Sequence, residues 1–297
     1  MKRTILLIIA AVTVAAAAAQ DRGNLHETPR IKIGLNYYSF NTPLTQGDET
    51  IEGVIDYAAD LGFEGVDITG YYFPGYPAVP SDQYILQVKS HAFHQGMTIC
   101  GTGVRNDFTL ADPVARAAQV QLVKDWVVVA SKLGASTIRV FAGPGTPEGY
   151  TWEQTAVWLA AAVDECAEFA KPYGVVIALQ NHDDFLKTGD DVEKIFKLIR
   201  SDNAGLMLDV GCYHTDPYRE IEQTIKHAVT WQIKENVFIN DVETPTDIPR
   251  IMEIIARNGY RGFVPIEILR AGGERERTAA MFEKVRAARE TEMAKLK

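Results

Sequence analysis

Hydrophobic and polar positions follow two alternating patterns along this chain from residue 31 onward. Short runs rich in Val, Ile and Leu, typical of buried strands, are each followed by a polar stretch and by apolar residues at helical spacing. The predicted strands are IKIGLNYYSF (31–40), GVDITGYY (65–72), TICGTGV (98–104), STIRVFAG (136–143), VVIALQNH (175–182), AGLMLDVG (204–211), TWQIKEN (230–236) and GFVPIEIL (262–269). Helices are predicted between them, for example over 50–63, 112–135 and 151–174.

Glycines stand where the predicted helices should stop, because glycine accepts the left-handed backbone of a helix end at little steric cost. They are Gly62, Gly96, Gly134, Gly174 and Gly259. Strands that alternate with helices pair in parallel. Eight such units predict an α/β chain whose residues 31–297 form a single-domain (β/α)8 TIM barrel. An open doubly wound sheet is the alternative, but no G-x-G-x-x-G turn follows the first strand and AGPGTPEG lacks the Lys-Ser/Thr of a phosphate loop.

The first residues predict export. Lys2 and Arg3 precede a long apolar run that ends in small residues, which is the layout of a secretory signal peptide. We expect residues 1–19 to be removed after Ala19, residues 20–30 to form a linker, and the mature protein to be periplasmic or secreted. An uncleaved membrane anchor is the alternative; after cleavage no stable membrane insertion is expected.

Charge and cysteine content narrow the class of protein further. Thirty basic and 39 acidic residues give a net charge of −9, which argues against a nucleic-acid partner, because Lys and Arg dominate phosphate binding. Cys100, Cys166 and Cys212 are odd in number and scattered, so we expect buried free thiols and no disulfide framework.

Polar side chains are predicted inside the barrel, since residues alternate between the interior and the helical shell along each strand. The inward polar positions are Asp67, Arg139, Gln180, His182, Asp209, Gln232, Lys234 and Glu267. Most lie near the carboxyl ends of strands, where barrel enzymes place their chemistry. Buried charges must pair, hold an ion or face a wet cavity. Arg139 pairing with Asp67 or Glu267, and His182 as an ordinary loop histidine, remain alternatives.

Several segments together resemble a known family. LGFEGVDI, RVFAG, LQNHDDF, LDVG, WQIKEN and GYRGFVPIEI are similar to the xylose isomerase-like TIM-barrel superfamily of sugar (phosphate) isomerases and epimerases, which includes the endonuclease IV fold. The resemblance implies Mn²⁺ or Mg²⁺ held by a Glu, an Asp, a His and a Glu on the fifth to eighth strands. Asp209 and Glu267 match this pattern, whereas Gln180 and Gln232 stand where the family has Glu and His.

These two departures change the expected chemistry. Asp209 and Glu267 supply two negative charges instead of three, and amide oxygens attract a cation less than carboxylates do, so we expect weak or conditional metal binding. An amide also cannot act as a base at neutral pH. Glu267 remains as a base, with Lys234, His182 or His214 to supply the second proton-transfer group. Lys234 has two interpretations: a pKa lowered toward neutrality by apolar walls, or a salt bridge to Glu267 or Asp209.

The sequence therefore predicts an exported isomerase or epimerase that removes a proton next to a carbonyl of a sugar, keto-sugar or cyclitol. The predicted substrate-binding residues are Tyr38, Asp67, Arg139, Asn181 and His214. Aromatic residues of the first two loops are expected to stack on a pyranose or to pack on the barrel rim; they are Tyr37, Tyr38, Tyr71, Tyr72 and Phe73. A non-catalytic carbohydrate-binding protein and a keto-glycoside lyase or hydrolase are the alternatives, and a homo-oligomer is compatible with the sequence. Phosphodiester hydrolysis is disfavoured by the acidic charge and the scarcity of inward histidines.

Overall fold

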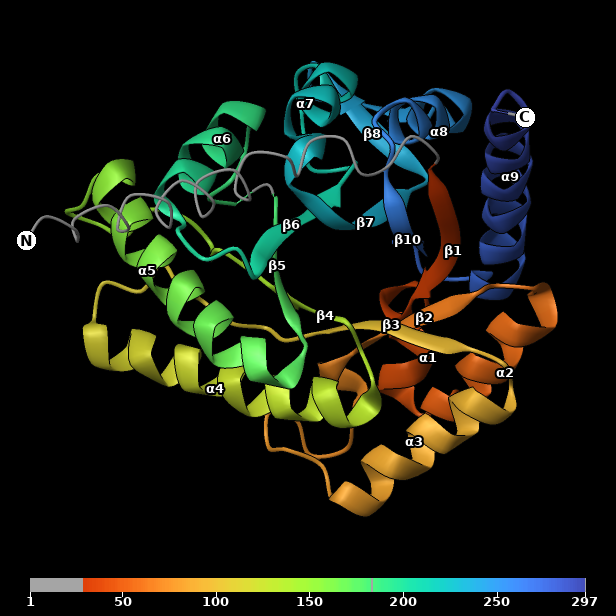
Figure 1. Ribbon diagram of the computed structural model, residues 1–297, viewed down its shortest axis with the longest axis horizontal. Helices are drawn as coiled ribbons and strands as arrows, with labels where there is room; N and C mark the ends of the chain where they lie inside the picture. The colour runs from red at the N-terminus through yellow and green to blue at the C-terminus, as the bar shows by residue number, and fades with distance from the viewer. Residues whose placement is uncertain (1–28, 183, 297) are drawn as a thin grey trace, which may run out of the picture.

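The computed structural model describes residues 29–182 and 184–296. Eight parallel strands close into a barrel in the order β1-β10-β7-β6-β5-β4-β3-β2 (Figure 1). The strands are β1 (Arg30–Asn36), β2 (Gly65–Thr69), β3 (Thr98–Gly103), β4 (Thr137–Val140), β5 (Val176–Gln180), β6 (Ala204–Asp209), β7 (Ala228–Lys234) and β10 (Arg261–Glu267). This architecture confirms the predicted TIM barrel, and all eight predicted strands are present.

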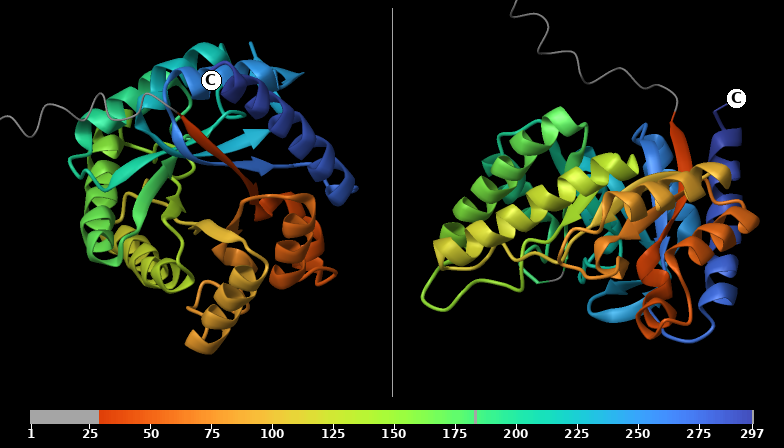
Figure 2. Two further views of the ribbon diagram at one scale, coloured as in Figure 1. Left: turned by 45° about the vertical axis from the view of Figure 1, so that its right-hand side comes forward. Right: turned by 90° about the horizontal axis from the view of Figure 1, so that it is seen from below.

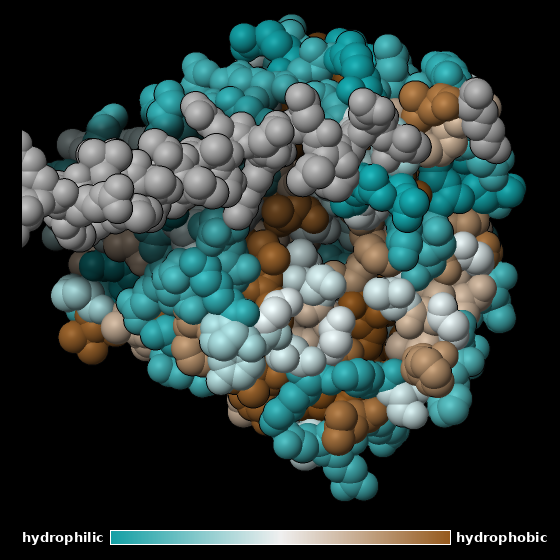
Figure 3. Space-filling view, viewed as in Figure 1, coloured by the Kyte–Doolittle hydropathy of each residue, from teal (hydrophilic) through white to brown (hydrophobic). Residues whose placement is uncertain are grey.

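Helices surround the barrel on its outside (Figure 2). They are α1 (Asn41–Gln46), α2 (Ile51–Leu61), α3 (Asp82–His94), α4 (Pro113–Leu133), α5 (Trp152–Ala170), α6 (Gly189–Leu198), α7 (Pro217–Thr224), α8 (Ile248–Arg257) and α9 (Glu274–Ala294). Gly62 and Gly134 end α2 and α4 with φ of 93° and 82°, as predicted from the need for a left-handed residue there. In the space-filling view, hydrophilic residues dominate the outer helices and hydrophobic residues show through toward the centre (Figure 3).

The layer between strands and helices is apolar. Ile177 and Leu179 of β5 and Trp231 and Ile233 of β7 are fully buried in the core, as expected for alternate residues that face the helices. Buried polar residues alternate with them on the same strands: Gln180 on β5, and Thr230, Gln232 and Lys234 on β7. The barrel therefore carries its polar side chains on the inside.

A short hairpin between β7 and α8 was not predicted. An antiparallel hairpin of β8 (Asn236–Ile239) and β9 (Val242–Pro245) follows β7 and precedes α8. Its turn residues, Asn240 and Asp241, have φ of 50° and 62°, a backbone that Asn and Asp tolerate and that suits a two-residue hairpin turn. The Asn-Asp pair was the available signal for this hairpin.

The predicted signal peptide (1–19) and all but the end of the predicted linker (20–30) lie outside the described residues. Strand β1 begins at Arg30, one residue before the predicted start of the barrel. Across 29–182 and 184–296, no helix combines the length and apolarity needed to cross a bilayer. Cys100, Cys166 and Cys212 are buried free thiols, as predicted.

Candidate active site

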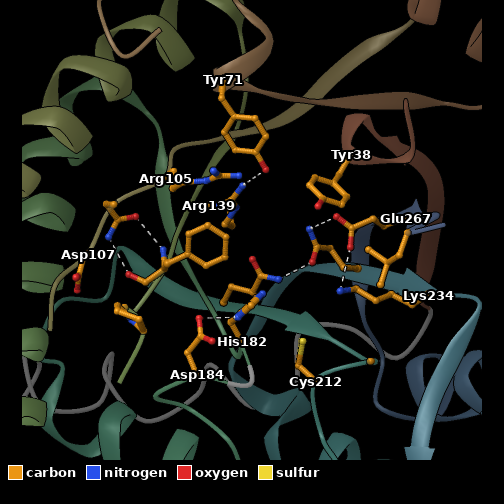
Figure 4. Close-up of a pocket in the computed structure, with 18 of the residues that line it drawn as sticks. Tyr38, Tyr71, Arg105, Asp107, Arg139, His182, Asp184, Cys212, Lys234 and Glu267 are labelled. Carbon is orange, nitrogen blue, oxygen red and sulfur yellow. Dashed lines mark hydrogen bonds and ion pairs between the residues drawn. The ribbon is translucent and has the colours of Figure 1, made fainter. Parts of the chain in front are cut away.

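A cavity of about 660 Å³ opens at the carboxyl ends of the barrel strands (Figure 4). Glu267 and Gln180, the last residues of β10 and β5, line it together with Lys234, the last residue of β7. Its other lining residues include Tyr38, Tyr71, Arg105, Asp107, Arg139, Phe141, His182, Asp184, Cys212, Gln232 and Phe238. The cavity is of a size that suits a small polar ligand.

The structure brings together the four residues that the sequence assigned to a metal. Gln180 Nε2 donates hydrogen bonds to Asp209 Oδ2 at 2.7 Å and to Gln232 Oε1 at 2.6 Å. Gln232 Nε2 in turn lies 3.3 Å from Glu267 Oε1. Strand register explains the convergence, because Asp209 is paired with Gln232, and Glu267 with the residue two positions later on β7. Four distant segments of the chain thus meet at one point.

Lys234 lies within this cluster as a cation. Its Nζ is 2.8 Å from Asp209 Oδ2 and 3.1 Å from Glu267 Oε2. Burial opposes the charged form of Lys234, but attraction from the two carboxylates outweighs this and raises its pKa well above the ordinary value. The prediction of a lysine with a lowered pKa is therefore wrong, and the salt-bridge alternative is the one that the structure adopts.

Glu267 has the properties of a proton-transfer group. Burial raises the pKa of this carboxyl, attraction to Lys234 lowers it, repulsion from Asp209 raises it again, and the net direction is upward. A carboxyl with a raised pKa exchanges protons at a pH closer to neutrality than an ordinary glutamate does. Because Glu267 also lines the cavity, it can reach a bound substrate.

His182 forms a second polar group on the cavity wall, from the loop after β5. Its Nδ1 lies 2.8 Å from Asp184 Oδ2, and its ring meets the edge of Phe141 with centroids 5.2 Å apart. A carboxylate on one ring nitrogen orients the imidazole, and an oriented imidazole suits proton transfer. Asp184 was not among the predicted site residues, although it lies only two positions from His182.

Arg139, at the centre of β4, faces the cavity with neutral partners. Its guanidinium donates to the Val104 carbonyl at 2.8 Å and to the Tyr71 hydroxyl at 3.2 Å, and it stacks over Phe141 at 4.0 Å. Among the described residues no carboxylate forms a direct ion pair with Arg139, so the predicted alternative of such a pair with Asp67 or Glu267 is wrong. The charge of Arg139 still acts on both carboxyls at longer range and opposes the rise in their pKa.

The same region holds a guanidinium that the sequence did not single out. Arg105 lies over the ring of Tyr71, 5.0 Å from its centroid, and lines the cavity with Arg139. Figure 4 shows the two arginines on the opposite side of the cavity from Lys234 and Glu267. Nothing in the local sequence around Arg105 indicates this position.

Comparisons with known proteins place this architecture in a family. Residues 55–290 match the family model described as "Xylose isomerase-like TIM barrel". The chain belongs to this family. No curated protein sequence matches the chain significantly.

Solved structures share the fold of this xylose isomerase-like barrel at low sequence identity. D-psicose 3-epimerase with D-tagatose from Clostridium cellulolyticum H10 is 19% identical, with a TM-score of 0.70 over 87% of this chain and 99% of that one. The 3-keto-D-glucoside 4-epimerase of E. coli is 14% identical, with a TM-score of 0.71 over 87% and 100%. An IOLI protein with a bound zinc atom is 17% identical, with a TM-score of 0.68 over 90% and 99%.

The side chains of this xylose isomerase-like barrel do not fit the Mn²⁺ or Mg²⁺ that the resemblance implied. An ion on Asp209 and Glu267 would meet the Lys234 ammonium, which already contacts both carboxylates. Gln180 presents a donor, Nε2, to Asp209, and its Oε1 is buried without a hydrogen-bond partner among the described residues. The opposite amide orientation would set that oxygen against a carboxylate. Across the described ranges no group of three or more His, Cys, Asp or Glu side chains is arranged to hold a metal.

Three of the predicted substrate-binding residues do not line the cavity, whereas Tyr38 and Arg139 do. Asp67 is buried and accepts a hydrogen bond of 2.9 Å from Asn36 Nδ2. His214 stacks on Phe238, with centroids 4.3 Å apart, and pairs with Asp241 of the hairpin turn. Because Phe238 itself lines the cavity, His214 supports the wall from behind.

The predicted aromatic residues divide between the cavity and the core. Tyr38 and Tyr71 line the cavity, where they can stack on a ligand. Tyr37 and Phe73 are buried in the hydrophobic core, and Tyr72 donates a hydrogen bond to Asn41 Oδ1 at 3.0 Å. Of the two predicted roles, packing therefore applies to Tyr37, Tyr72 and Phe73, whereas Tyr38 and Tyr71 are placed to contact a ligand.

Asn181 has a structural role that differs from the predicted one. Its side chain is fully buried and bonds both backbone groups of Asp209: Nδ2 donates to the carbonyl at 2.9 Å, and Oδ1 accepts from the amide at 2.8 Å. Asn181→Ala is expected to lower the free energy of unfolding by about 2–4 kcal/mol, since it strands two buried backbone groups. Urea unfolding measures this loss. Asn203→Ala, at an asparagine whose Nδ2 donates to two backbone carbonyls, is a comparison. An unfolding curve that Asn181→Ala leaves unchanged would contradict the assignment.

Asp67 is expected to make stability depend on pH. Burial raises the pKa of Asp67 from 3.8 to about 7, against the opposing effects of Arg139 and Asn36. Between these values the folded protein holds a proton that the unfolded chain has lost, so this residue lowers stability as pH rises from 4 to 7, by about 4 kcal/mol in total. Urea unfolding from pH 4 to 8 should show this decline in wild type and a smaller decline in Asp67→Asn. If the free energy of unfolding depends on pH in the same way in wild type and in Asp67→Asn, the pKa of Asp67 is not raised in the folded protein.

Proposed function

We propose that this xylose isomerase-like barrel is a sugar isomerase or epimerase that removes a proton next to the carbonyl of a keto-sugar. One observation carries the proposal: a buried carboxylate, Glu267, and the His182–Asp184 pair line the same cavity. Two proton-transfer groups on one small cavity are what a reaction that removes and returns a carbon-bound proton requires.

Glu267 takes the proton from the carbon beside the carbonyl, and the electron pair of that bond moves toward the carbonyl oxygen to give an enediolate. His182, oriented by Asp184, returns a proton to complete the change. Return to the opposite face of the same carbon restores the carbonyl and gives an epimer. Return to the former carbonyl carbon gives an isomer, with the hydroxyl proton of the first carbon passing to the former carbonyl oxygen as the new carbonyl forms. Arg139 and Arg105 supply N–H donors that bind other oxygens of the substrate, at positions distant from the reacting carbon.

Free keto-sugars and keto-glycosides are the substrates we propose. Structures that share the fold include enzymes named for D-psicose, L-ribulose and 3-keto-D-glucoside. The signal-like first residues favour a periplasmic or secreted enzyme and therefore an unphosphorylated substrate. Tyr38 and Tyr71 offer the flat apolar surfaces on which a sugar ring stacks.

Solvent exchange tests the proposed function directly. Purified protein is incubated in D₂O with D-fructose, D-psicose, L-ribulose and a 3-keto-glucoside, and the sugars are followed by NMR. We expect deuterium to appear at the carbon beside the carbonyl, together with an epimer or isomer. Calorimetric binding with no exchange would instead support a carbohydrate-binding protein, and an unsaturated product would support a lyase. If the protein neither binds any of these sugars nor exchanges deuterium into them, the proposal of a keto-sugar substrate is refuted.

A further inference from the structure

We infer that the ε-ammonium of Lys234 is the built-in cation of this site and stabilises the oxyanion formed during catalysis, in the position where a divalent metal would otherwise lie. The chemical part of this inference rests on the proposed function. Its structural part concerns only which cation the two carboxylates of the cluster hold, and it is tested separately.

The position of Lys234 is the first support. Its Nζ lies between Asp209 of β6 and Glu267 of β10, at 2.8 Å and 3.1 Å from their nearest oxygens. The side chains of Lys234, Asp209 and Glu267 are 9%, 0% and 6% exposed, so solvent cations do not compete freely for these carboxylates. A buried ammonium held by two carboxylates is a permanent positive charge of this site.

Charge balance is the second support. Asp209, Glu267 and Lys234 sum to a net charge of −1. The three carboxylates and one dication implied by the family resemblance also sum to −1. With Lys234 as the cation, a third carboxylate at position 180 would leave −2 in a buried place, and the neutral amide of Gln180 avoids this.

The two glutamines are the third support, because they act as donors toward the carboxylates. Gln180 Nε2 bonds Asp209 at 2.7 Å, and Gln232 Nε2 faces Glu267 at 3.3 Å. A metal requires ligand oxygens that point inward, whereas an ammonium leaves carboxylate lone pairs that amide N–H groups can satisfy. The departures from the family pattern at 180 and 232 are therefore complementary to a lysine at 234.

A glycine close to the end of strand β6, Gly211, leaves room for the side chain of Lys234. A β-carbon at Gly211 would lie 2.7 Å from Lys234 Cδ and would displace the lysine stem. Gly211 lies two residues after Asp209, the last residue of β6. The site thus combines a glycine that admits the stem with carboxylates and amides that fix its ammonium.

The chemistry follows from the hydrogens of the ammonium. Two of its three N–H groups bond Asp209 and Glu267, and the third is left for a substrate oxygen, since Lys234 lines the cavity. When Glu267 takes the carbon-bound proton, the C–H electron pair forms the C=C bond and the carbonyl π electrons move onto oxygen. The Lys234 ammonium stabilises that negative oxygen without giving up its proton, and reprotonation of carbon restores the carbonyl.

Metal content and metal binding test the inference without any activity assay. Wild-type protein purified without chelator is analysed for Mn, Mg, Zn and Fe, and then titrated with Mn²⁺ by calorimetry. We expect far less than one metal ion per chain and no saturable Mn²⁺ binding. The variant Gln180→Glu/Gln232→His/Lys234→Met restores the ligand types of the family and removes the ammonium. We expect it to bind Mn²⁺ at least about 10–100-fold more tightly than wild type.

The matched control is Gln180→Glu/Gln232→His, which has the restored ligands but keeps Lys234. It should bind Mn²⁺ more weakly than the variant that also carries Lys234→Met. Stoichiometric metal in wild type, or Mn²⁺ binding by wild type as tight as by the variant, would overturn the inference. Circular dichroism checks folding, and the wild-type measurements decide the matter even if the variant does not fold.

The catalytic part has its own readout. Deuterium exchange into the substrate should be unchanged by EDTA in wild type and lost in Lys234→Met. Exchange that EDTA abolishes and Mn²⁺ restores would refute the role of Lys234 as the catalytic cation. If none of the sugars exchanges, the proposed function fails, while the metal measurements still establish which cation the site holds.

Discussion

Lys234→Met is expected to lower the free energy of unfolding by about 3–5 kcal/mol, because it leaves two buried carboxylates without their cation. Asp209 is fully buried and Glu267 nearly so, and only amide donors remain to them. Attraction to Lys234 lowers the pKa of Glu267, so without the lysine Glu267 will prefer to be protonated in the folded state and its pKa there will rise. The loss should therefore shrink as pH falls and grow as pH rises. Urea unfolding at several pH values measures both the loss and its direction.

Lys171 provides a matched control on the surface. Its Nζ also contacts two carboxylates, Glu168 at 2.7 Å and Asp202 at 2.9 Å, but its side chain is 41% exposed. Lys171→Met should change the unfolding curve little, since solvent screens this pair. Adding Asp209→Asn and Glu267→Gln to Lys234→Met should recover part of the lost stability, because these three positions then carry no buried charge. Equal losses at Lys171 and Lys234 would show that burial of the cluster contributes nothing.

The barrel was predictable because its signals are local. Each strand shows alternating or continuous apolar positions over a few residues, and glycines such as Gly62 and Gly134 mark the helix ends. The meeting of Gln180, Asp209 and Glu267 also follows from local information, since the carboxyl ends of inward-facing parallel strands share one end of a barrel. No contact between distant residues had to be known in advance.

The partners of Lys234 were not predictable in the same way. Gln232 and Lys234 both face inward, and alternation alone does not say which carboxylate each one meets. Strand register places Glu267 beside Lys234 and Asp209 beside Gln232. The contacts of the side chains cross this register, because the Lys234 ammonium reaches both carboxylates and Gln232 Nε2 faces Glu267. Two carboxylates within reach then raise the pKa of the lysine, where the apolar-wall interpretation expected a lower one.

Asn181 and the hairpin illustrate two other limits. Asn181 follows the last inward residue of β5, and the sequence does not show that its amide reaches the backbone of β6. The hairpin of β8 and β9 holds Phe238 against the cavity, yet its strands are only four residues each. Short strands carry little periodic signal, so their wall residues are found only from the structure.

Glu267→Gln is expected to reduce deuterium exchange at the substrate carbon by about 10²–10⁴-fold, on the proposed function, because an amide cannot accept the proton. The substitution preserves shape and leaves Asp209 to hold Lys234. Glu243→Gln, on the exposed hairpin, is the control and should exchange at the wild-type rate. Folding is compared by thermal melting, so that loss of exchange is not confused with loss of structure.

His182→Asn separates the two proton transfers. In this variant Glu267 can still remove and return a proton on its own face of the substrate, so deuterium should enter the substrate while conversion to the epimer or isomer is lost. Glu267→Gln should lose both. NMR in D₂O follows the incorporation of deuterium into the substrate and its conversion to product in the same sample. If His182→Asn converts substrate at the wild-type rate, the second transfer belongs to another group and the His182–Asp184 pair only shapes the cavity wall.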